Sequence, residues 1–549
     1  MHRRKFLYLT GGLAGLAMQP ATNVILFREA ANKQIQHDVL GMYVHEGWPY
    51  NHPYAARTWT VEDWRGYADG LSKLGYNTLV IWPALEIMPE PLTPSDHAQL
   101  NKIADVINIL HREFGFLVFL TLCPNLLADQ KLAARYTFER RPLFSSVKFV
   151  DPSDVHAMRR LIDWRQRLLR PLAQMDGIAI IDSDPGGFPG STNAEFVTLL
   201  ADHRNMLDQI RPGIELYYWM HVGWEAYSLY YATGHFRWGT PPEAEDVLRK
   251  LKNIDPRPWG ITIHTLDPPP NGTDLKLAEK FGVASTSLAF NYGAIEGEPE
   301  FPLTNFGGDA AFKAGGAGAP HGVVGNAQSH CLQLPNSFAF ARGAKRQPVA
   351  EADYTQFANG LIEGNADLIV TSWRAIAGSD PRLMRSVADE LDAVLNDTLR
   401  PGPLKGLLFG NPRRFMADLM YQLRMKSAYL DFVTSSRNNV DRETFRAFLV
   451  GTQRWQHQHG FQAAWPSIWQ GGNWAGLGET LKKLESPSID RILAETSWLA
   501  DINNWAITSQ QAGGSTSFER VQNLYHKWDT NTLRLISAMQ ETLEKTSSR

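Results

Sequence analysis

Short apolar runs alternate with amphipathic helical segments through roughly the first 350 residues of the chain. The helical segments repeat apolar residues every three or four positions, as in Trp64, Tyr67, Leu71 and Leu74, behind a capping residue such as Thr60. Strands of a parallel sheet are buried on both faces, so they read as short continuous apolar runs. Eight such runs occur, at residues 39–44, 77–82, 116–122, 177–181, 214–220, 259–263, 284–290 and 322–326.

Eight consecutive βα units are typical of a closed barrel. An open doubly wound sheet more often has about five to seven strands, so the number favours a (β/α)8 TIM barrel, expected over residues 36–348. Beyond residue 349 only helical periodicity continues, with a first helix expected over residues 351–373 and helix starts at Asp380 and Asp441. The expected fold class is therefore α/β, a TIM barrel followed by a C-terminal α-helical domain over residues 349–549.

The amino terminus carries the features of an export signal. Arg3 and Arg4 precede a short, weakly apolar stretch over residues 9–18, with small residues near Ala21. This pattern resembles a twin-arginine signal, and a general secretory signal that contains two arginines is the alternative. The apolar stretch is shorter than the roughly 20 residues that a membrane-spanning helix needs. We expect residues 1–30 to form a signal and the mature chain to be periplasmic or secreted, without membrane attachment.

Charge and cysteine content argue against several classes of protein. Lys and Arg number 54 against 57 Asp and Glu, and the net charge of −3 provides no basic field to attract a nucleic acid. Cys123 and Cys331 are too few for a disulfide framework or a structural zinc site, so we expect two buried thiols. The Gly-rich residues 315–318 lack the spacing of a phosphate-binding loop, and no cofactor is expected. The 17 Trp residues are either core residues or stacking platforms of the kind that sugar sites use.

Polar and aromatic residues cluster where the expected strands end. In a TIM barrel the side chains at the carboxyl ends of the strands face one bowl, which holds the active site. Aromatic rings stack on sugar faces and amide side chains pair with hydroxyl groups, so this set is typical of a carbohydrate site. The expected substrate-binding residues are His45, Glu46, Trp82, Trp219, His221, His264, Asn291, Tyr292, Asn326, Gln328 and His330.

Two aspartates follow the fourth apolar run. Asp182 and Asp184 stand two residues apart, so in an extended strand their carboxylates project from one face, about 7 Å apart. Repulsion between two such charges raises one pKa, which leaves one carboxyl protonated as a general acid while the other stays ionised. Glycoside hydrolysis requires this division of roles. We expect Asp184 to be the catalytic acid and Asp182 its charged neighbour, with helix capping or binding of a structural ion as the alternative roles.

The layout of residues 39–345 resembles a group of glycosidases. Paired acids ending strand four, Trp-rich strand ends, Asn291-Tyr292 after strand seven and a helical C-terminal domain are similar to the substrate-assisted retaining hexosaminidases of families 20 and 84. The resemblance implies that Asp184 donates the proton and that Asp182 orients a 2-acetamido group acting as internal nucleophile. The acids of that group are adjacent, whereas Ser183 separates them here, a spacing closer to family 18 chitinases, in which the second acid is Glu. An ordinary two-carboxylate mechanism therefore stays open, with a second group from Glu46, Glu225 or Asp267.

Two other classes of function use the same bowl. A metal-dependent hydrolase or isomerase would take zinc or manganese ligands from the strand ends, namely His45, His221, His264, His330 and Asp182 or Asp184. No His-x-His pair ends the first run, and single histidines also hydrogen-bond sugar hydroxyls, so we expect no metal. A non-catalytic carbohydrate-binding protein is the other class. The function that we expect is hydrolysis of a glycosidic bond in an extracytoplasmic carbohydrate by carboxylate acid/base catalysis.

Overall fold

The computed structural model describes residues 39–48, 51–143, 146–183, 186–188, 190–221, 223–225, 241–254, 260–264, 273–291, 293–296, 304, 306, 309–459, 476–496 and 533–545. Eight parallel strands close into a barrel in the order β1-β10-β9-β8-β7-β6-β3-β2, which confirms the (β/α)8 expectation. The barrel strands are β1 (Val39–His45), β2 (Thr78–Trp82), β3 (Leu117–Leu122), β6 (Gly177–Ile181), β7 (Glu215–Trp219), β8 (Gly260–His264), β9 (Leu288–Asn291) and β10 (Gly322–Ala327).

Every expected apolar run overlaps one barrel strand. The seventh strand is shorter than the run that predicted it, because residues Ala284–Thr286 form a 3-10 turn and β9 begins only at Leu288. The loop after β3 holds a separate antiparallel pair, β4 (Leu126–Ala128) and β5 (Val147–Phe149). This pair lies outside the barrel sheet, so the eight-strand count is unchanged.

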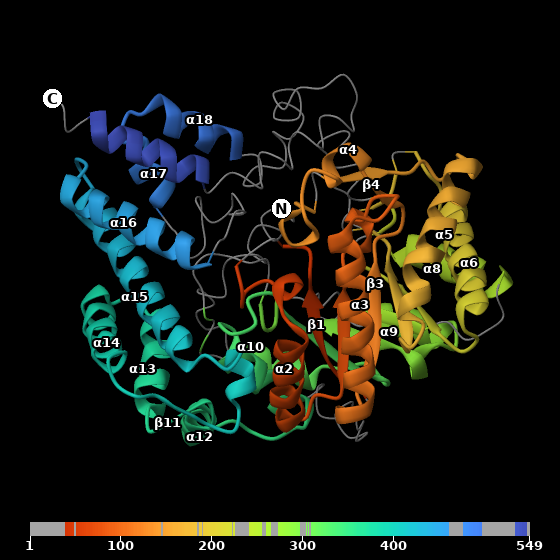
Figure 1. The fold of residues 1–549 in the computed structure, drawn as a ribbon, viewed down its shortest axis with the longest axis horizontal. Coiled ribbons are helices and arrows are strands. Elements are labelled where there is room, and N and C mark those ends of the chain that lie inside the picture. Colours follow the sequence, from red (N-terminus) through yellow and green to blue (C-terminus); the bar gives the residue numbers. More distant parts are fainter. Residues whose placement is uncertain are drawn as a thin grey trace, which may run out of the picture.

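Helices connect the barrel strands. Thr60, Thr93 and Thr192 each close a capping box at a helix start, which explains the sharp beginnings of α2, α3 and α6. Figure 1 shows these helices around the strands, in the red-to-green part of the chain. The barrel helices are α2 (Val61–Leu74), α3 (Pro94–Ile109), α5 (Val155–Leu169), α6 (Asn193–Ile210), α8 (Pro241–Ile254), α9 (Thr273–Lys280), α10 (Ala310–Gly316) and α11 (Leu334–Ala344).

The C-terminal region is helical, as expected, and lies to one side of the barrel (Figure 1). The single helix expected over residues 351–373 is wrong, because the chain forms two helices with Gly364 between them at a φ of 80°. The segments 464–474 and 497–532 lie outside the described residues. The helices of this region are α12 (Glu351–Leu361), α13 (Ala366–Ala377), α14 (Pro381–Val394), α15 (Pro412–Ser435), α16 (Arg442–His459), α17 (Leu477–Lys482), α18 (Pro487–Thr496) and one over 533–545.

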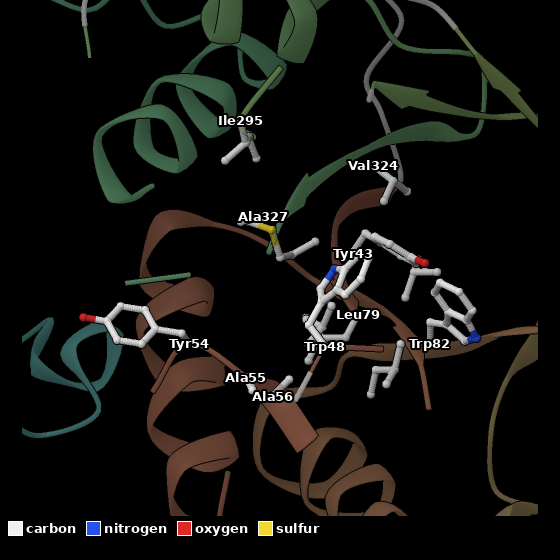
Figure 2. Packing of buried hydrophobic residues seen from close by; sticks show 14 of the residues in the cluster. Tyr43, Trp48, Tyr54, Ala55, Ala56, Leu79, Trp82, Ile295, Val324 and Ala327 are labelled. Carbon is white, nitrogen blue, oxygen red and sulfur yellow. The ribbon is translucent and has the colours of Figure 1, made fainter. Parts of the chain in front are cut away.

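Helix α15 joins this region to two loops at the carboxyl ends of barrel strands. The guanidinium of Arg414 lies 5.3 Å from the ring centroid of Tyr54, in the loop after β1. The side chain of Gln422 accepts the backbone N–H of Thr304 at 2.8 Å and donates to its hydroxyl at 3.2 Å. In Figure 2, Tyr54 points away from Tyr43 and toward the blue-green helical segment. The helical region is therefore part of the support of the loops around the barrel mouth.

Neither cysteine of the chain forms a disulfide, and both are buried, as expected. Within the described ranges, no helix combines the length and the apolar character that crossing a membrane requires.

Candidate active site

Residues that alternate along β1 and β10 face the axis of the barrel. The ring of Tyr43 meets the ring of Trp219 at 5.6 Å and that of Phe290 at 5.4 Å, although these residues come from strands that do not pair with β1. Two residues earlier, a Cβ on Gly41 would lie 2.9 Å from the side chain of Val324, its partner across the strand pair. Because side chains alternate between the two faces of a strand, His45 and Asn326 also face the axis.

His45 lies between two indoles at the end of β1. Its ring stacks on Trp48 with centroids 5.3 Å apart and meets Trp82 edge-on at 4.2 Å. Its Nδ1 accepts the backbone N–H of Gly47 at 2.7 Å, and burial, followed by the nearby charge of Arg57, lowers its pKa well below the usual range. The imidazole is therefore neutral. Figure 2 shows Trp48 and Trp82 beside Tyr43.

The indole of Trp48 is oriented by the loop after β10. Its Nε1–H donates to the side-chain oxygen of Gln328, and the backbone N–H of Gln328 donates to Glu296. The sequence prediction placed Gln328 at the site, and the structure connects it to the aromatic wall formed by His45, Trp48 and Trp82. Trp48 stands three residues beyond the end of β1, so its place at the site was open to the same sequence reasoning.

Trp219 and Asn326 hold buried donors inside the barrel that find no partner among the described residues. Trp219 is 2% exposed and Asn326 is 1% exposed. Within the described part of the chain, Trp219 Nε1 and Asn326 Nδ2 have no hydrogen-bond partner. The side-chain oxygen of Asn326 accepts the N–H of Gly293 at 3.2 Å, which determines the orientation of the amide. Buried donors are nearly always paired in folded proteins, so these two groups are candidates for donating to a bound ligand at the strand ends.

The carboxylate of Asp182 supports the loop after the next strand. Its Oδ2 accepts the backbone N–H groups of His221 and Gly223, each at 3.2 Å, and lies 3.4 Å from the hydroxyl of Tyr218. Tyr218 packs on Phe196 of α6, so this carboxylate lies toward the helix layer rather than the axis. Asp184 lies outside the described residues. The catalytic role of the pair stays a prediction.

Two other acids make the same kind of contact. Glu86, after β2, accepts the N–H of Cys123 after β3 at 2.7 Å and the Nε1–H of Trp82 at 3.1 Å. Glu296, after β9, accepts the N–H groups of Gln328 and Ser329 after β10. Each acid thus holds the loop that follows the neighbouring strand. The sequence reasoning missed both residues, because they stand four and five residues beyond their strands and carry no motif.

Two glutamates at the strand ends are shielded from solvent. Burial raises the pKa of Glu46 to about 7 and that of Glu296 to about 7. Glu46, an expected substrate-binding residue, accepts the Nε2–H of Gln99 on α3 at 2.7 Å. It points to the helix layer, because it directly follows His45 and therefore projects to the opposite side. Both carboxyls are poised to exchange a proton near neutral pH.

The remaining expected residues occupy different surroundings. His330 is fully buried, contacts the hydroxyl of Tyr67 on α2 at 2.7 Å and has a pKa lowered to about 3 by burial. The ring of His221 lies 6.5 Å from that of Trp219. His264 ends β8 in register with Phe290. The side chains of His264 and Asn291, as well as Tyr292 and Asp267, lie outside the described residues.

Among the described residues, no three His, Cys, Asp or Glu side chains gather as a metal site would require. Two of the candidate ligands, His45 and His330, instead contact Gly47 and Tyr67. The metal hypothesis stays a prediction for the strand ends that the structure leaves undescribed.

The chain is a TIM-barrel protein with a helical C-terminal region. No protein-family model and no curated protein matches it. Its structure is similar to that of a GH138 enzyme targeting pectin rhamnogalacturonan II, over 85% of this chain and 69% of that one, at 10% identity and a TM-score of 0.43. A GH20 beta-N-acetylhexosaminidase from Streptomyces coelicolor A3(2) is similar over 58% and 66% of the two chains, at 12% identity and a TM-score of 0.33.

Lyases share the barrel as well. The sialic acid aldolase of Aliivibrio salmonicida is similar over 70% of this chain and 97% of its own, at 12% identity and a TM-score of 0.31. Structures that share the barrel thus include both glycosidases and aldolases. At such identities the likeness concerns the fold alone, and the function has to be argued from the site.

Proposed function

We propose that the chain is a glycoside hydrolase whose sugar site lies at the carboxyl ends of the barrel strands. The observation that carries the proposal is the aromatic wall of His45, Trp48 and Trp82, with Trp219 across the axis. Indole and imidazole rings are the groups that stack on the apolar face of a pyranose, and in this proposal the neutral imidazole and the amide of Asn326 serve its hydroxyl groups.

In this proposal Asp184 is the general acid that protonates the leaving oxygen, and Asp182 is its charged neighbour. The amide groups that bind Asp182 hold its carboxylate in one orientation. With a 2-acetamido sugar the reaction would be retaining and substrate-assisted, and the carboxylate of Asp182 would act by supporting the loop after β7 rather than by touching the acetamido group. The carbohydrate would be extracytoplasmic, since residues 1–30 resemble an export signal.

A screen of chromogenic glycosides, including N-acetylated and uronic sugars, tests the reaction. We expect the wild-type chain to hydrolyse at least one glycoside and Asp184→Asn to lower kcat by roughly 10²- to 10⁴-fold, because an amide cannot give up the proton. Asp69→Asn, which removes a surface partner of Lys73 on α2, is the matched control and should retain full activity. Full activity of Asp184→Asn would remove the assignment of the acid.

A non-catalytic carbohydrate-binding protein is the second candidate. It is favoured by the three carboxylates Glu86, Asp182 and Glu296, since each accepts backbone N–H groups. Saturable sugar binding by the wild-type chain, without turnover of any glycoside in the screen, would select this candidate.

A further inference from the structure

The donors of Trp219 and Asn326, which have no partner in the described part of the chain, lie on strands that the barrel brings to the two sides of the ring of Tyr43. Trp219 ends β7 and contacts the ring of Tyr43 at 5.6 Å, whereas Asn326 of β10 is the register partner of Tyr43 on β1. We infer that Trp219 Nε1–H and Asn326 Nδ2–H form a donor pair that binds hydroxyl or carbonyl oxygens of an uncharged sugar. This inference rests on the proposed function and names its substrate class.

The contact with Gly293 determines which way the side-chain amide of Asn326 is turned. Its oxygen accepts the N–H of Gly293, so its NH₂ group is directed elsewhere and needs an acceptor. The indole N–H of Trp219 can only donate. Each group is at least 98% buried, and within the described ranges neither finds an acceptor in the protein. Sugar oxygens are acceptors that satisfy both groups, and the neighbouring rings cover the apolar face of the same molecule.

Among the described residues, the charges at the strands and at Arg57 and Arg165 favour an uncharged ligand. None of the eight barrel strands contains Lys or Arg. Arg57 directs its guanidinium to the carbonyl oxygens of Glu46 and Phe138, among others, and Arg165 directs its own to those of Cys123 and Pro124. A sugar carboxylate beside Trp219 and Asn326 would meet neutral donors without a cation from any strand, so its loss of water would be poorly compensated.

Calorimetric titration with matched sugars tests the inference. The probes are methyl glycosides of glucose, galactose and N-acetylglucosamine, and the methyl glycosides of glucuronic and galacturonic acid. Asn326→Asp keeps an oxygen for Gly293 and removes the donor, and Trp219→Phe keeps a ring and removes the N–H. Trp224→Phe is the control, because it deletes an indole N–H that likewise has no partner among the described residues, from a ring that stacks on Phe196 in the helix layer.

We expect a neutral glycoside to bind at least about tenfold more tightly than its uronic counterpart. Asn326→Asp and Trp219→Phe should each weaken that binding by about three- to tenfold, the range expected for one lost hydrogen bond, whereas Trp224→Phe should not change it. If Asn326→Asp does not fold, Trp219→Phe decides alone.

Tighter binding of the uronic sugar would overturn the inference and leave the proposed function standing. Unchanged sugar affinity in both Asn326→Asp and Trp219→Phe would also overturn the inference and leave the proposed function standing, since it would mean that a water and not the sugar satisfies the donors. If no glycoside in the set is bound or hydrolysed by the wild-type chain, the proposed function fails, and the inference fails with it.

Discussion

The carboxylate of Glu296 accepts the backbone N–H of Gln328, the residue whose side-chain oxygen orients the indole of Trp48. Contacts therefore run from the end of β9 through the end of β10 to the stacked rings at the end of β1. A change at Glu296 should reach the aromatic wall, although this glutamate does not touch it.

Glu296→Ala should destabilise the protein by about 1–3 kcal/mol for each amide left without an acceptor. It removes the acceptor of two buried N–H groups, those of Gln328 and Ser329, whereas Glu296→Gln retains an oxygen for them. Urea unfolding measures the loss, with exposed Glu62→Gln as control. Equal stability of Glu296→Ala and the wild-type chain would show that this contact carries no weight.

The stability that protonated Glu46 contributes to the fold should fall as the pH rises from about 5 to 8. The pKa of Glu46 is raised from 4.5 to about 7, so the folded state holds a proton that the unfolded state has already lost. The contribution is complete below the unfolded pKa and is lost as the pH passes 7; it is worth about 3 kcal/mol for this buried group. Glu296, whose pKa is also raised to about 7, contributes stability with the same pH dependence.

Glu46→Gln should remove this contribution, so the difference in the free energy of unfolding between pH 5 and pH 8 should change by about 3 kcal/mol relative to the wild type, because the amide mimics the protonated acid at every pH. The measurement is the free energy of unfolding at pH 5 and pH 8, in the variant and in the wild type. An unchanged difference in Glu46→Gln would contradict the raised pKa.

Asn125→Ala should lower kcat more than it changes KM for the substrate found in the screen. The buried amide of Asn125 binds both the N–H and the carbonyl of Gly187 and holds Val150 as well, at 2.8–2.9 Å. Gly187 lies three residues after Asp184 in the sequence, so releasing Gly187 should disturb the placement of the proposed acid through the intervening chain. Asn359→Ala, which removes an exposed contact to Gly364, serves as control. Unaltered kinetics in Asn125→Ala would separate this segment from catalysis.

Gln422→Ala should destabilise the whole chain by about 1–3 kcal/mol, because it leaves the buried N–H of Thr304 without its acceptor. Gln453→Ala, an exposed glutamine of α16, should cost less than about 0.5 kcal/mol. Thermal unfolding compares the two variants. If their melting temperatures agree, α15 does not support the barrel loop through this contact.

Dialysis against a chelator should leave the activity unchanged under the glycosidase proposal, since no step in it uses a metal. Elemental analysis of the purified protein accompanies the assay. Stoichiometric metal, with activity lost on chelation and restored by zinc or manganese, would select the metal-dependent alternative.

The local pattern was sufficient for the strands and most helix starts. Continuous apolar runs mark strands that are buried on both faces, and capping residues such as Thr60 mark helix starts, and both signals reside in a few consecutive residues. Gly364 broke a helix that apolar periodicity predicted as continuous, because a local backbone preference overrode the pattern.

The sequence was sufficient to locate the candidate site at the strand ends, but not to predict which of its side chains face the barrel axis and which face the helices. His45 and Glu46 are neighbours after one strand, and alternation sends one toward the axis and the other toward α3. Such alternation is available from the sequence once the register is known. The contact of Glu296 with Gln328 spans 32 positions and follows no spacing rule, so nothing in the sequence pointed to it.

By itself, the sequence determined a barrel of eight parallel strands with a helical region after it, because these features depend on periodicity and capping over short stretches of chain. Only the tertiary structure decided which strand-end groups meet. Closing the barrel brings β10 beside β1 and makes Asn326 the neighbour of Tyr43. The NH₂ group of Asn326 is then buried without a protein acceptor in the described residues. Long-range burial of this kind depends on chain closure, and no local pattern encodes it.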